Sequence, residues 1–349
     1  MAMTIVEGTR AITGGVDTHL EVHVAAALDP VGGLLGVKEF CTSREGEREL
    51  LAWLSGFGSV ERVGVEGTGS YGASLGRFLS GAGVQVVEVD RPNRQARHRQ
   101  GKSDPVDAVE AARAALGGRA AGAAKGRDGN VEAIRALMVA KRSARSVRIK
   151  TINQIRHLSF TAPEEIRARY KDISSRQGIA TQVAVLRPRP GGDPVVFATK
   201  IAMRTLGRRV LALDEEKVAL DTLLTELVTA TAPELLALAG VGIDTAALLL
   251  VAAGDNAQRI RNEAAWAHFC GVAPIEASSG KTVRHRLNRG GDRQANHALW
   301  RIVITRMSSD PRTKTYVARR LAEGRTKSEI IRVLKRYVAR EVFKHLPRD

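Results

Sequence analysis

The sequence is poor in aromatic residues and cysteines, and it begins without a long apolar run. Aromatic side chains make up 4% of the 349 residues, which argues against a protein that binds single strands mainly by stacking bases. The two cysteines, Cys41 and Cys270, cannot form a disulfide framework, so we expect a reducing compartment. Met1–Gly15 lacks the basic start and apolar run of a signal peptide. These absences predict a cytoplasmic protein.

The most apolar segment, Leu235–Gly254, is close to the length of a membrane span. It is interrupted in its middle by Gly240, Gly242, Asp244 and Thr245. Glycines and a carboxylate at that position are unfavourable in the core of a bilayer. We therefore expect two short helices here and no membrane partner.

Negative charge is scarce outside the first third of the chain, whose total net charge is +17. Residues 1–115 carry 12 Lys and Arg against 15 Asp and Glu, whereas residues 116–349 carry 42 against 22. From Lys281 to Asp349 the count is 19 against 6. This asymmetry indicates a chemistry module joined to a module that binds nucleic acid, and hence a nucleoid-associated protein. The alternatives are a solvated basic surface or a ribosome-associated chain without chemistry.

The first third has the pattern of an α/β domain. Apolar runs beside turn residues predict a first strand around Asp17 and further strands over Val22–Leu28, Leu34–Phe40, Val60–Val65 and Val84–Val89. Helical spacing predicts helices over Arg44–Leu54 and Tyr71–Ser80. A basic loop, Arg91–Lys102, then leads into a helix that begins near Asp104.

The rest of the chain is expected to be helical. The residues from Val131 to about His157 form a basic helical pattern, and Arg187–Gly192 is a loop. A heptad seam with one polar interruption follows, made of Leu206, Val210, Leu213, Lys217, Leu220, Leu224 and Leu227. Such a seam predicts a two-helix coiled-coil arm or a dimer interface. An amphipathic helix packed within its own subunit is the alternative.

The segment from Leu235 to Ala246 has the shape of a helix-hairpin-helix. Its turn contains Gly240 and Gly242 beside a helix N-terminus, where bare backbone amides suit a phosphate without base specificity. The same pattern also occurs in plain helical turns.

Four carboxylates have positions that suit a metal site. Asp17 lies in the first strand and Glu66 ends a later one, while Asp104 and Asp107 lie three residues apart at a helix start. Acids that converge at one sheet edge could hold one or two Mg²⁺ ions, with Mn²⁺ as a substitute, to polarise a phosphodiester. The alternative is structural: Asp104 as an N-cap before Pro105, and Asp17 as a turn residue.

A second candidate is a serine in the segment Ala277–Lys281. A serine between a glycine turn and cations could attack a phosphodiester, although most Ser-Ser-Gly triplets are loops. The surrounding cations could hold backbone phosphates; they are Lys281, Arg284, Arg286, Arg289 and Arg293.

Taken together, these segments resemble the DEDD transposases of the IS one-ten insertion-sequence family. The resemblance covers nearly the whole chain and rests on Gly15–Asp17, Glu66–Tyr71, Lys102–Ala108, the glycines at 240 and 242, Phe269–Pro274, Ser279–Lys281 and Asn288–Gly291. Two features depart from the family pattern. Leu20 stands where many relatives have lysine, and the serine motif has one glycine where many have two.

The resemblance implies a RuvC-like, RNase H-type domain over residues 1–118, in which Asp17, Glu66, Asp104 and Asp107 bind metal. It also implies a C-terminal transposase domain over 231–349. With the helical coiled-coil arm that the heptad seam predicts over 119–230, the expected fold is α/β plus all-α. Ser279 is the expected nucleophile and Ser278 the fallback. The expected partners are the DNA of the element ends and target, a structured non-coding guide RNA, and further copies in a dimer or tetramer.

We therefore predict an Mg²⁺-dependent transposase that cleaves and exchanges DNA strands with a serine nucleophile under RNA guidance. The first alternative is a site-specific DNA invertase or a RuvC-like junction-resolving nuclease, the latter with water in place of serine. The second is a non-catalytic scaffold that binds nucleic acid.

Overall fold

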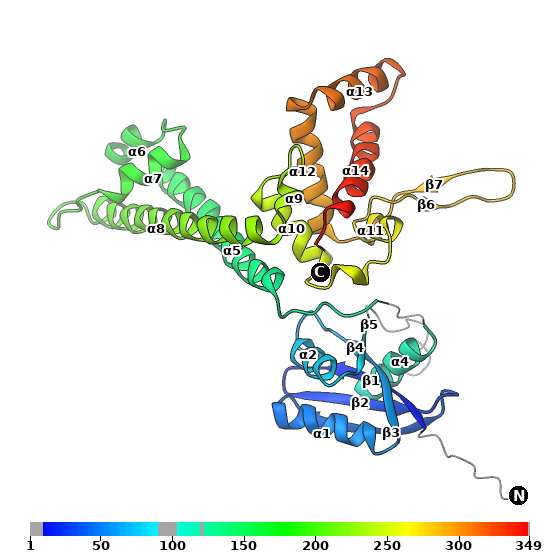
Figure 1. Cartoon of the computed structure of the whole chain (residues 1–349). Coiled ribbons are helices and arrows are strands. Elements are labelled where there is room, and N and C mark those ends of the chain that lie inside the picture. The colour runs from blue at the N-terminus through cyan, green and yellow to red at the C-terminus, as the bar shows by residue number, and fades with distance from the viewer. Residues whose placement is uncertain (1–9, 90–102, 119–121, 348–349) are drawn as a thin grey trace, which may run out of the picture. The chain divides into compact units, whose positions relative to one another are not determined.

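The computed structural model describes residues 10–89, 103–118 and 122–347, which form two compact units (Figure 1). The first contains the chain up to Gly129 together with Ala253–Phe269. The second contains Asn130–Ala252 and Cys270–Pro347. The predicted basic loop over Arg91–Lys102 lies outside the described residues. These units divide the chain at other points than the three expected domains, which stay a prediction.

The first unit is built on a mixed five-stranded sheet with the strand order β3-β2-β1-β4-β5. Its strands are β1 (Ala11–Thr18), β2 (Val22–Leu28), β3 (Leu34–Cys41), β4 (Ser59–Glu66) and β5 (Gln85–Val89). The first three form an antiparallel meander, and β4 and β5 run parallel to β1. The strands predicted for this part of the sequence are confirmed.

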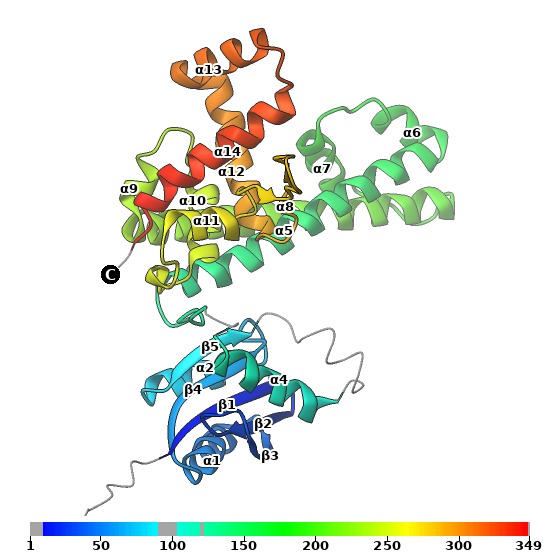
Figure 2. The same ribbon diagram turned by 90° about the vertical axis from the view of Figure 1, so that its right-hand side faces the viewer.

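Helices cover both faces of this sheet (Figure 2). On one face, α1 (Arg44–Ser55) and α2 (Ala73–Gly81) bury leucines against valines of β1 and β4. On the other face, α4 (Asp104–Leu116) packs Ala108 against Val24 and Ala26 of β2. The unit also contains the short elements η1 (Ala257–Arg259) and α11 (Glu263–Phe269). Successive side chains of the buried strands point to opposite faces of the sheet, so each strand packs against helices on both sides.

Two glycines allow α4 to lie directly on the sheet. A Cβ atom at Gly15 would lie 2.1 Å from the backbone nitrogen of Ala112, and one at Gly64 would lie 2.5 Å from the carbonyl oxygen of Ala111. The facing surface of α4 consists of small residues, so helix and strands meet almost backbone to backbone. Because strand residues two apart share a face, Gly15 and Gly64 lie on the same face as Asp17 and Glu66.

The second unit begins with a long helix pair. Helix α5 (Asn130–Thr161) packs antiparallel against α8 (Pro194–Thr231), with α6 (Glu164–Tyr170) and α7 (Arg176–Ala184) between them in the chain. Its remaining elements are α9 (Pro233–Leu236), α10 (Ile243–Ala253), the hairpin β6 (Ile275–Glu276) and β7 (His285–Arg286), α12 (Arg293–Ser309), α13 (Pro311–Ala322) and α14 (Lys327–Lys344). In Figure 1 the β6–β7 hairpin extends away from these helices.

The buried face of α8 differs in part from the predicted heptad seam. Val210 and Leu224 are buried as expected, but Met203, Gly207 and Val228 are buried too, whereas the seam's other leucines are half-buried. The partners of this face are α5 and α7 of the same chain. A coiled-coil geometry of this pair and a contact with a second copy stay predictions.

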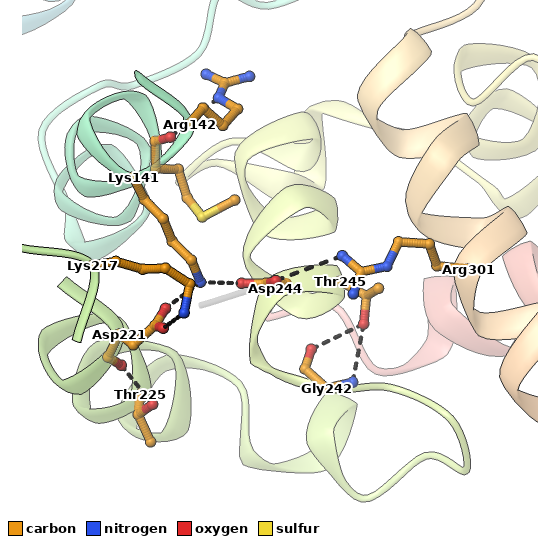
Figure 3. A network of polar contacts seen from close by, with 10 residues as sticks. Lys141, Arg142, Lys217, Asp221, Thr225, Gly242, Asp244, Thr245 and Arg301 are labelled. Atoms are coloured by element: carbon orange, nitrogen blue, oxygen red, sulfur yellow. Dashed lines mark hydrogen bonds and ion pairs between the residues drawn. The ribbon is translucent and has the colours of Figure 1, made fainter. Parts of the chain in front are cut away.

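The middle of this pair is ionic (Figure 3). Lys141 of α5, with 13% of its side chain exposed, forms ion pairs with Asp221 of α8 and Asp244 of α10. Asp221 also pairs with Lys217 at 2.9 Å, and Asp244 pairs with Arg301 of α12 at 3.6 Å. Lys141 therefore ties three helices together where the heptad pattern has its polar interruption.

We expect Lys141→Met to lower the free energy of unfolding by about 2 kcal/mol at neutral pH, because it removes charged hydrogen bonds that are partly shielded from solvent. Burial alone would lower the pKa of Lys141, but the hydrogen bonds and charges of Asp221 and Asp244 together outweigh it and raise that pKa. Burial alone would raise the pKa of Asp221, but the hydrogen bonds and charges of Lys141 and Lys217 together lower it. This contribution is thus present at neutral pH. It disappears as the pH falls through the lowered Asp221 pKa or rises through the raised Lys141 pKa.

Urea unfolding at several pH values measures the difference between wild type and variant. Lys150→Met is the control, because Lys150 is an exposed residue of the same helix. An equal loss in both variants, or a difference that does not change with pH, would contradict this role of Lys141.

The two glycines of the turn before α10 already make contacts within the protein. The preceding helix, α9, is a single turn. Gly240 has a φ of +75° and packs on α12, whereas the amide of Gly242 donates to the hydroxyl of Thr245 at 3.0 Å. Phosphate binding by Gly240 and Gly242 stays a prediction. Within the described residues no helix is both long and apolar enough to cross a membrane.

Candidate active site

Three side chains meet at the end of β1. Asp17 is buried, and the Nε2 atom of His19 lies 3.2 Å from its carboxylate and 3.4 Å from that of Asp104. One ligand atom from each of the three lies within 4.8 Å of the others. Asp17 and His19 come from one strand end, and Asp104 comes from the first turn of α4. The packing of α4 across β1 therefore assembles this group.

Asp104 is not the N-cap that an ordinary helix start would make it. Helix α4 begins with Asp104 itself, and its N-cap is Ser103, whose side chain makes no capping hydrogen bond. The Asp104 carboxylate lies near His19 instead, with 49% of its side chain exposed. This arrangement favours a ligand role for Asp104 over a capping role.

Glu66 and Asp107 lie at the same edge of the sheet. Glu66 follows Val65, the register partner of Val16, so Asp17 and Glu66 occupy corresponding positions in neighbouring parallel strands. Its carbonyl accepts a 2.7 Å hydrogen bond from Thr18, which fixes the two strand ends together. Asp107 is 2% exposed and close enough to Asp17 to affect its ionisation. Their role as metal ligands stays a prediction.

The electrostatics of Asp17 suit a cation. Burial raises the pKa of Asp17, His19 lowers it, and the charges of Asp107 and Asp104 raise it again, with a net increase above the ordinary value. The ionised form of Asp17 is therefore less stable here than in water, and a divalent cation among these groups would stabilise it. Carboxylate oxygens and an imidazole nitrogen are suitable donors for such an ion. The acidic cluster is consistent with a divalent metal site.

His19 belongs to this group although it was not among the candidate residues predicted from the sequence. It follows Asp17 by two residues and hence lies on the same face of the strand. The spacing alone could have indicated it. The close approach of Asp104 to the same imidazole depends on the position of α4 and has no signal in the local sequence.

The predicted nucleophile lies in the exposed hairpin of the second unit. The backbone groups of Ser279 and Thr282 exchange hydrogen bonds of 3.1 Å in both directions, which closes a two-residue turn. Gly280 takes the first central position with a φ of +56°, the sign that a type II′ turn requires and that glycine adopts without strain. The serine pair therefore lies beside the tip of a defined hairpin.

The two serines differ in what their hydroxyls contact. The Ser278 oxygen accepts a 3.1 Å hydrogen bond from the backbone nitrogen of Arg284 on the opposite strand. Among the contacts of the described residues, none involves the hydroxyl of Ser279, which is exposed. Ser279 is therefore the serine whose oxygen can approach a substrate without breaking the hairpin.

The predicted phosphate-binding cations surround this hairpin. Lys281 lies in the turn, Arg284 and Arg286 lie on the returning strand, Arg289 follows it, and Arg293 begins α12. All five are exposed. Nucleic-acid binding by these cations stays a prediction, as it does for the two glycines before α10.

The base of the hairpin is held by close packing. A Cβ atom at Gly291 would lie 2.2 Å from the backbone nitrogen of Gly271, so the two segments cross at van der Waals contact. The amide of Asn296 donates to the Cys270 carbonyl at 2.8 Å, and Lys335 of α14 donates to Asn296 at 2.9 Å. Glycine is therefore needed in the Phe269–Pro274 and Asn288–Gly291 motifs because the two segments cross too closely for a Cβ atom at Gly291.

Comparison with known proteins connects both units to one family. A family model described as "Transposase", for the DEDD domain of IS110 elements, matches residues 14–161. A second model, described as "Transposase IS116/IS110/IS902 family", matches residues 232–318. The chain is also 33% identical over 134 residues to the "Insertion element IS110 uncharacterized 43.6 kDa protein" of Streptomyces coelicolor. That match covers 38% of the length of this chain and 33% of the length of the relative.

The N-terminal match contains the sheet from residue 14 onward together with its acids, and the C-terminal match contains the serine hairpin. The mixed sheet with its helices is accordingly the RNase H-like DEDD domain, followed by a helical region. The match to the DEDD model precedes the match to the second model along the chain, and the two matches do not overlap. The chain belongs to the IS110 family of transposases.

Proposed function

We propose that this protein is a transposase that cleaves and joins DNA strands of an insertion sequence, using a divalent metal and a serine nucleophile. The observation that carries the proposal is the convergence of Asp17, His19 and Asp104 at the end of β1 in a chain of this family. A scaffold without chemistry would not require a carboxylate whose pKa is raised by burial and by the charges of neighbouring acids.

Asp17, Glu66, Asp104 and Asp107 are the residues proposed to hold Mg²⁺, with Mn²⁺ as a substitute. When bound, the ion would supply polarisation of the scissile phosphodiester and stabilisation of the departing oxygen. His19 holds the Asp17 and Asp104 carboxylates in position through its Nε2 atom. Thr18 orients the end of β4 by its bond to the Glu66 carbonyl.

Ser279 is proposed to attack the scissile phosphorus. Its Oγ atom forms a bond to phosphorus and gives its proton to solvent, while the bond from phosphorus to the deoxyribose oxygen breaks. That oxygen takes up a proton and leaves as a hydroxyl, and the protein–DNA ester then awaits a second strand end. Support comes from the exposed Ser279 hydroxyl and the cations beside it, which would attract the phosphate and favour the charge that develops on it.

The proposal extends to the partners of the reaction. The basic hairpin suits contacts with the backbone of DNA, and such contacts carry no sequence information. A structured non-coding RNA that pairs with donor and target DNA would supply the specificity that these side chains lack. We also propose a dimer or tetramer in which acids and serine of different subunits combine.

The test is capture of a covalent protein–DNA adduct on a denaturing gel, with the full chain, element-junction DNA, the element's RNA and Mg²⁺. We expect an adduct with wild type and with Ser278→Ala, and at least a hundredfold less with Ser279→Ala, which lacks the attacking oxygen. Ser278→Ala is a matched control, because it removes the neighbouring hydroxyl. Omission of RNA should abolish the adduct on the specific junction.

Other outcomes would indicate another activity for this protein or another arrangement of its subunits. Metal-dependent cleavage that persists in Ser279→Ala would indicate a junction-resolving nuclease that uses water. Tight, salt-dependent binding without cleavage or adduct would indicate a scaffold. A mixture of Asp17→Asn and Ser279→Ala proteins should regain adduct formation if subunits share their sites, and would remain inactive if each subunit acts alone.

A further inference from the structure

A basic pocket lies at the base of the serine hairpin. Its volume is about 610 Å³, within the usual range for sites that enclose a small organic group. One wall comes from the segments that flank the hairpin, including Pro274 and Leu287, and the other comes from α14. The α14 wall lies outside the part of the chain that the family model for the C-terminal match covers.

The charges of this pocket are all of one sign. Among the described residues that line it, none is acidic, and the cationic ones are Arg286, Arg289, Arg332, Lys335 and Arg336. Burial lowers the pKa of Lys335, and the neighbouring Arg332 lowers it further. Burial and Arg340 likewise lower the pKa of Arg336. Cations gathered in one pocket repel one another, and an anion among them would stabilise them, so a ligand of negative charge fits this pocket.

The pocket also has apolar and aromatic walls. Tyr337 and Leu287 line it with 50% and 53% of their surfaces exposed, beside Val272, Ala273 and Val333. Guanidinium groups and a tyrosine ring are the side chains on which unstacked bases pack in proteins that bind single strands. A free phosphate would use the cations and leave this apolar surface exposed. A nucleotide within a strand would use both.

We infer that this pocket holds a single unstacked nucleotide of the DNA strand, with its base against Tyr337 and Leu287 and its phosphate on Arg286, Arg289 and Arg332. The inference rests on the proposed function in so far as that function makes DNA the substrate. The scarcity of aromatic residues in the whole chain fits one local pocket better than an extended stacking surface.

The hairpin relates the pocket to the reaction. Ile275 pairs with Arg286 at the pocket end of the hairpin, and Ser279 lies four residues further along the same arm of the hairpin, beyond the end of β6. At the rise of a β-strand this separation is about 13 Å, or about four nucleotide steps of a duplex strand. Extrusion of one nucleotide there would hold the strand in register with Ser279 and favour strands that unpair easily.

The experiment compares two DNA duplexes that differ only in one unpaired thymine. Binding of the full-length protein is measured by fluorescence anisotropy at fixed salt, with EDTA present to prevent cleavage. We expect wild type to bind the bulged duplex about tenfold more tightly than the fully paired one, because the unpaired base is already free to enter the pocket. In the complex, the thymine should also be protected from permanganate.

The variants assign this preference to the pocket. Tyr337→Ala should reduce the tenfold preference to about twofold or less, whereas Tyr337→Phe should keep it. Arg332→Gln should weaken binding of the bulged duplex more than that of the paired duplex. Lys327→Gln is the matched control, because it removes an exposed cation from the same helix outside the pocket, and it should leave the preference unchanged. Thermal unfolding of each variant confirms that it is folded.

Equal affinity of wild type for the two duplexes would overturn the inference, as would a full preference in folded Tyr337→Ala. A preference confined to an RNA bulge would overturn the assignment to DNA. These results leave the proposed function intact if the adduct still forms. Absence of binding to either duplex would instead contradict both.

Discussion

Asp17→Asn should lower DNA cleavage by about a thousandfold or more while the protein stays folded. The substitution keeps the shape of the side chain but removes a carboxylate charge from the cluster of Asp17, His19 and Asp104. A loss of about 4 kcal/mol of transition-state stabilisation corresponds to this factor and is a reasonable share of what a catalytic metal contributes. Single-turnover cleavage of the junction DNA measures it.

The same variant should be at least as stable as the wild type without metal. Burial and the charges of Asp107 and Asp104 raise the Asp17 pKa, so the folded protein binds a proton at Asp17 more readily than the unfolded chain does. Metal-free wild type therefore loses stability as the pH rises from the ordinary aspartate pKa through the raised one. Asp17→Asn lacks this loss, so the two proteins should diverge as the pH rises through that range.

Added Mg²⁺ should reverse this order, because a ligand that binds only the folded state raises its stability. Wild type should gain in melting temperature and Asp17→Asn should gain little. Glu39→Gln is the control, because Glu39 is an exposed acid on β3 of the same sheet, and it should respond like wild type. An unchanged cleavage rate in Asp17→Asn, or an equal Mg²⁺ shift in both proteins, would rule out a metal ligand at this position.

Gly15→Ala should impair both the fold and the site, although it adds a single methyl group. That group would lie 2.1 Å from the backbone nitrogen of Ala112 and 2.3 Å from the carbonyl oxygen of Ala108. Both are atoms of helix backbone, so α4 must move as a whole. We expect a loss of about 3 kcal/mol in the free energy of unfolding. Cleavage should fall by about a hundredfold or more, since a shift of about 1 Å displaces Asp104 and Asp107.

Gly76→Ala provides the matched control for this prediction. Gly76 lies within α2, and apart from the backbone of its own helix turn and its chain neighbours no heavy atom lies within 4 Å of the Cβ position there. Alanine in a helix is favoured over glycine by about 1 kcal/mol, so this variant should be neutral or more stable and fully active. Chemical denaturation and the cleavage assay test both variants. If Gly15→Ala kept normal stability and activity, the close packing of α4 would not be what positions the acids.

Much of the site was predictable because its residues have local signatures. Asp17 and Glu66 end apolar runs that are typical of strands, and Asp104 with Asp107 begins a helix after a serine and beside a proline. Carboxyl ends of neighbouring parallel strands meet at one edge, which brings the strand acids together. The glycine turn at the hairpin tip was also readable, but Ser279 was chosen over Ser278 only through the family resemblance.

The heptad seam shows where a local pattern is insufficient. Spacings of three and four identified one side of α8 but could not show that Gly207 would pack against α7, since a Cβ there would lie 2.7 Å from Ala184. Nor could they show that Lys141 would pair with Asp221 and Asp244. Which leucines become fully buried depends on the helices that arrive from elsewhere in the chain.

The sequence by itself determined the strands of the first unit, the helical character of the long pair, the charge asymmetry and the candidate acids, because these follow from residue type and from periods of two and 3.6 residues. It did not predict the hairpin of β6 and β7. Only the tertiary structure decided that His19 contacts both Asp17 and Asp104, that Ser278 is bonded within the hairpin, and that α14 completes a pocket with Arg286 and Arg289. Those contacts join residues that are far apart in the chain. They depend on backbone approaches, such as α4 over Gly15, that no local pattern encodes.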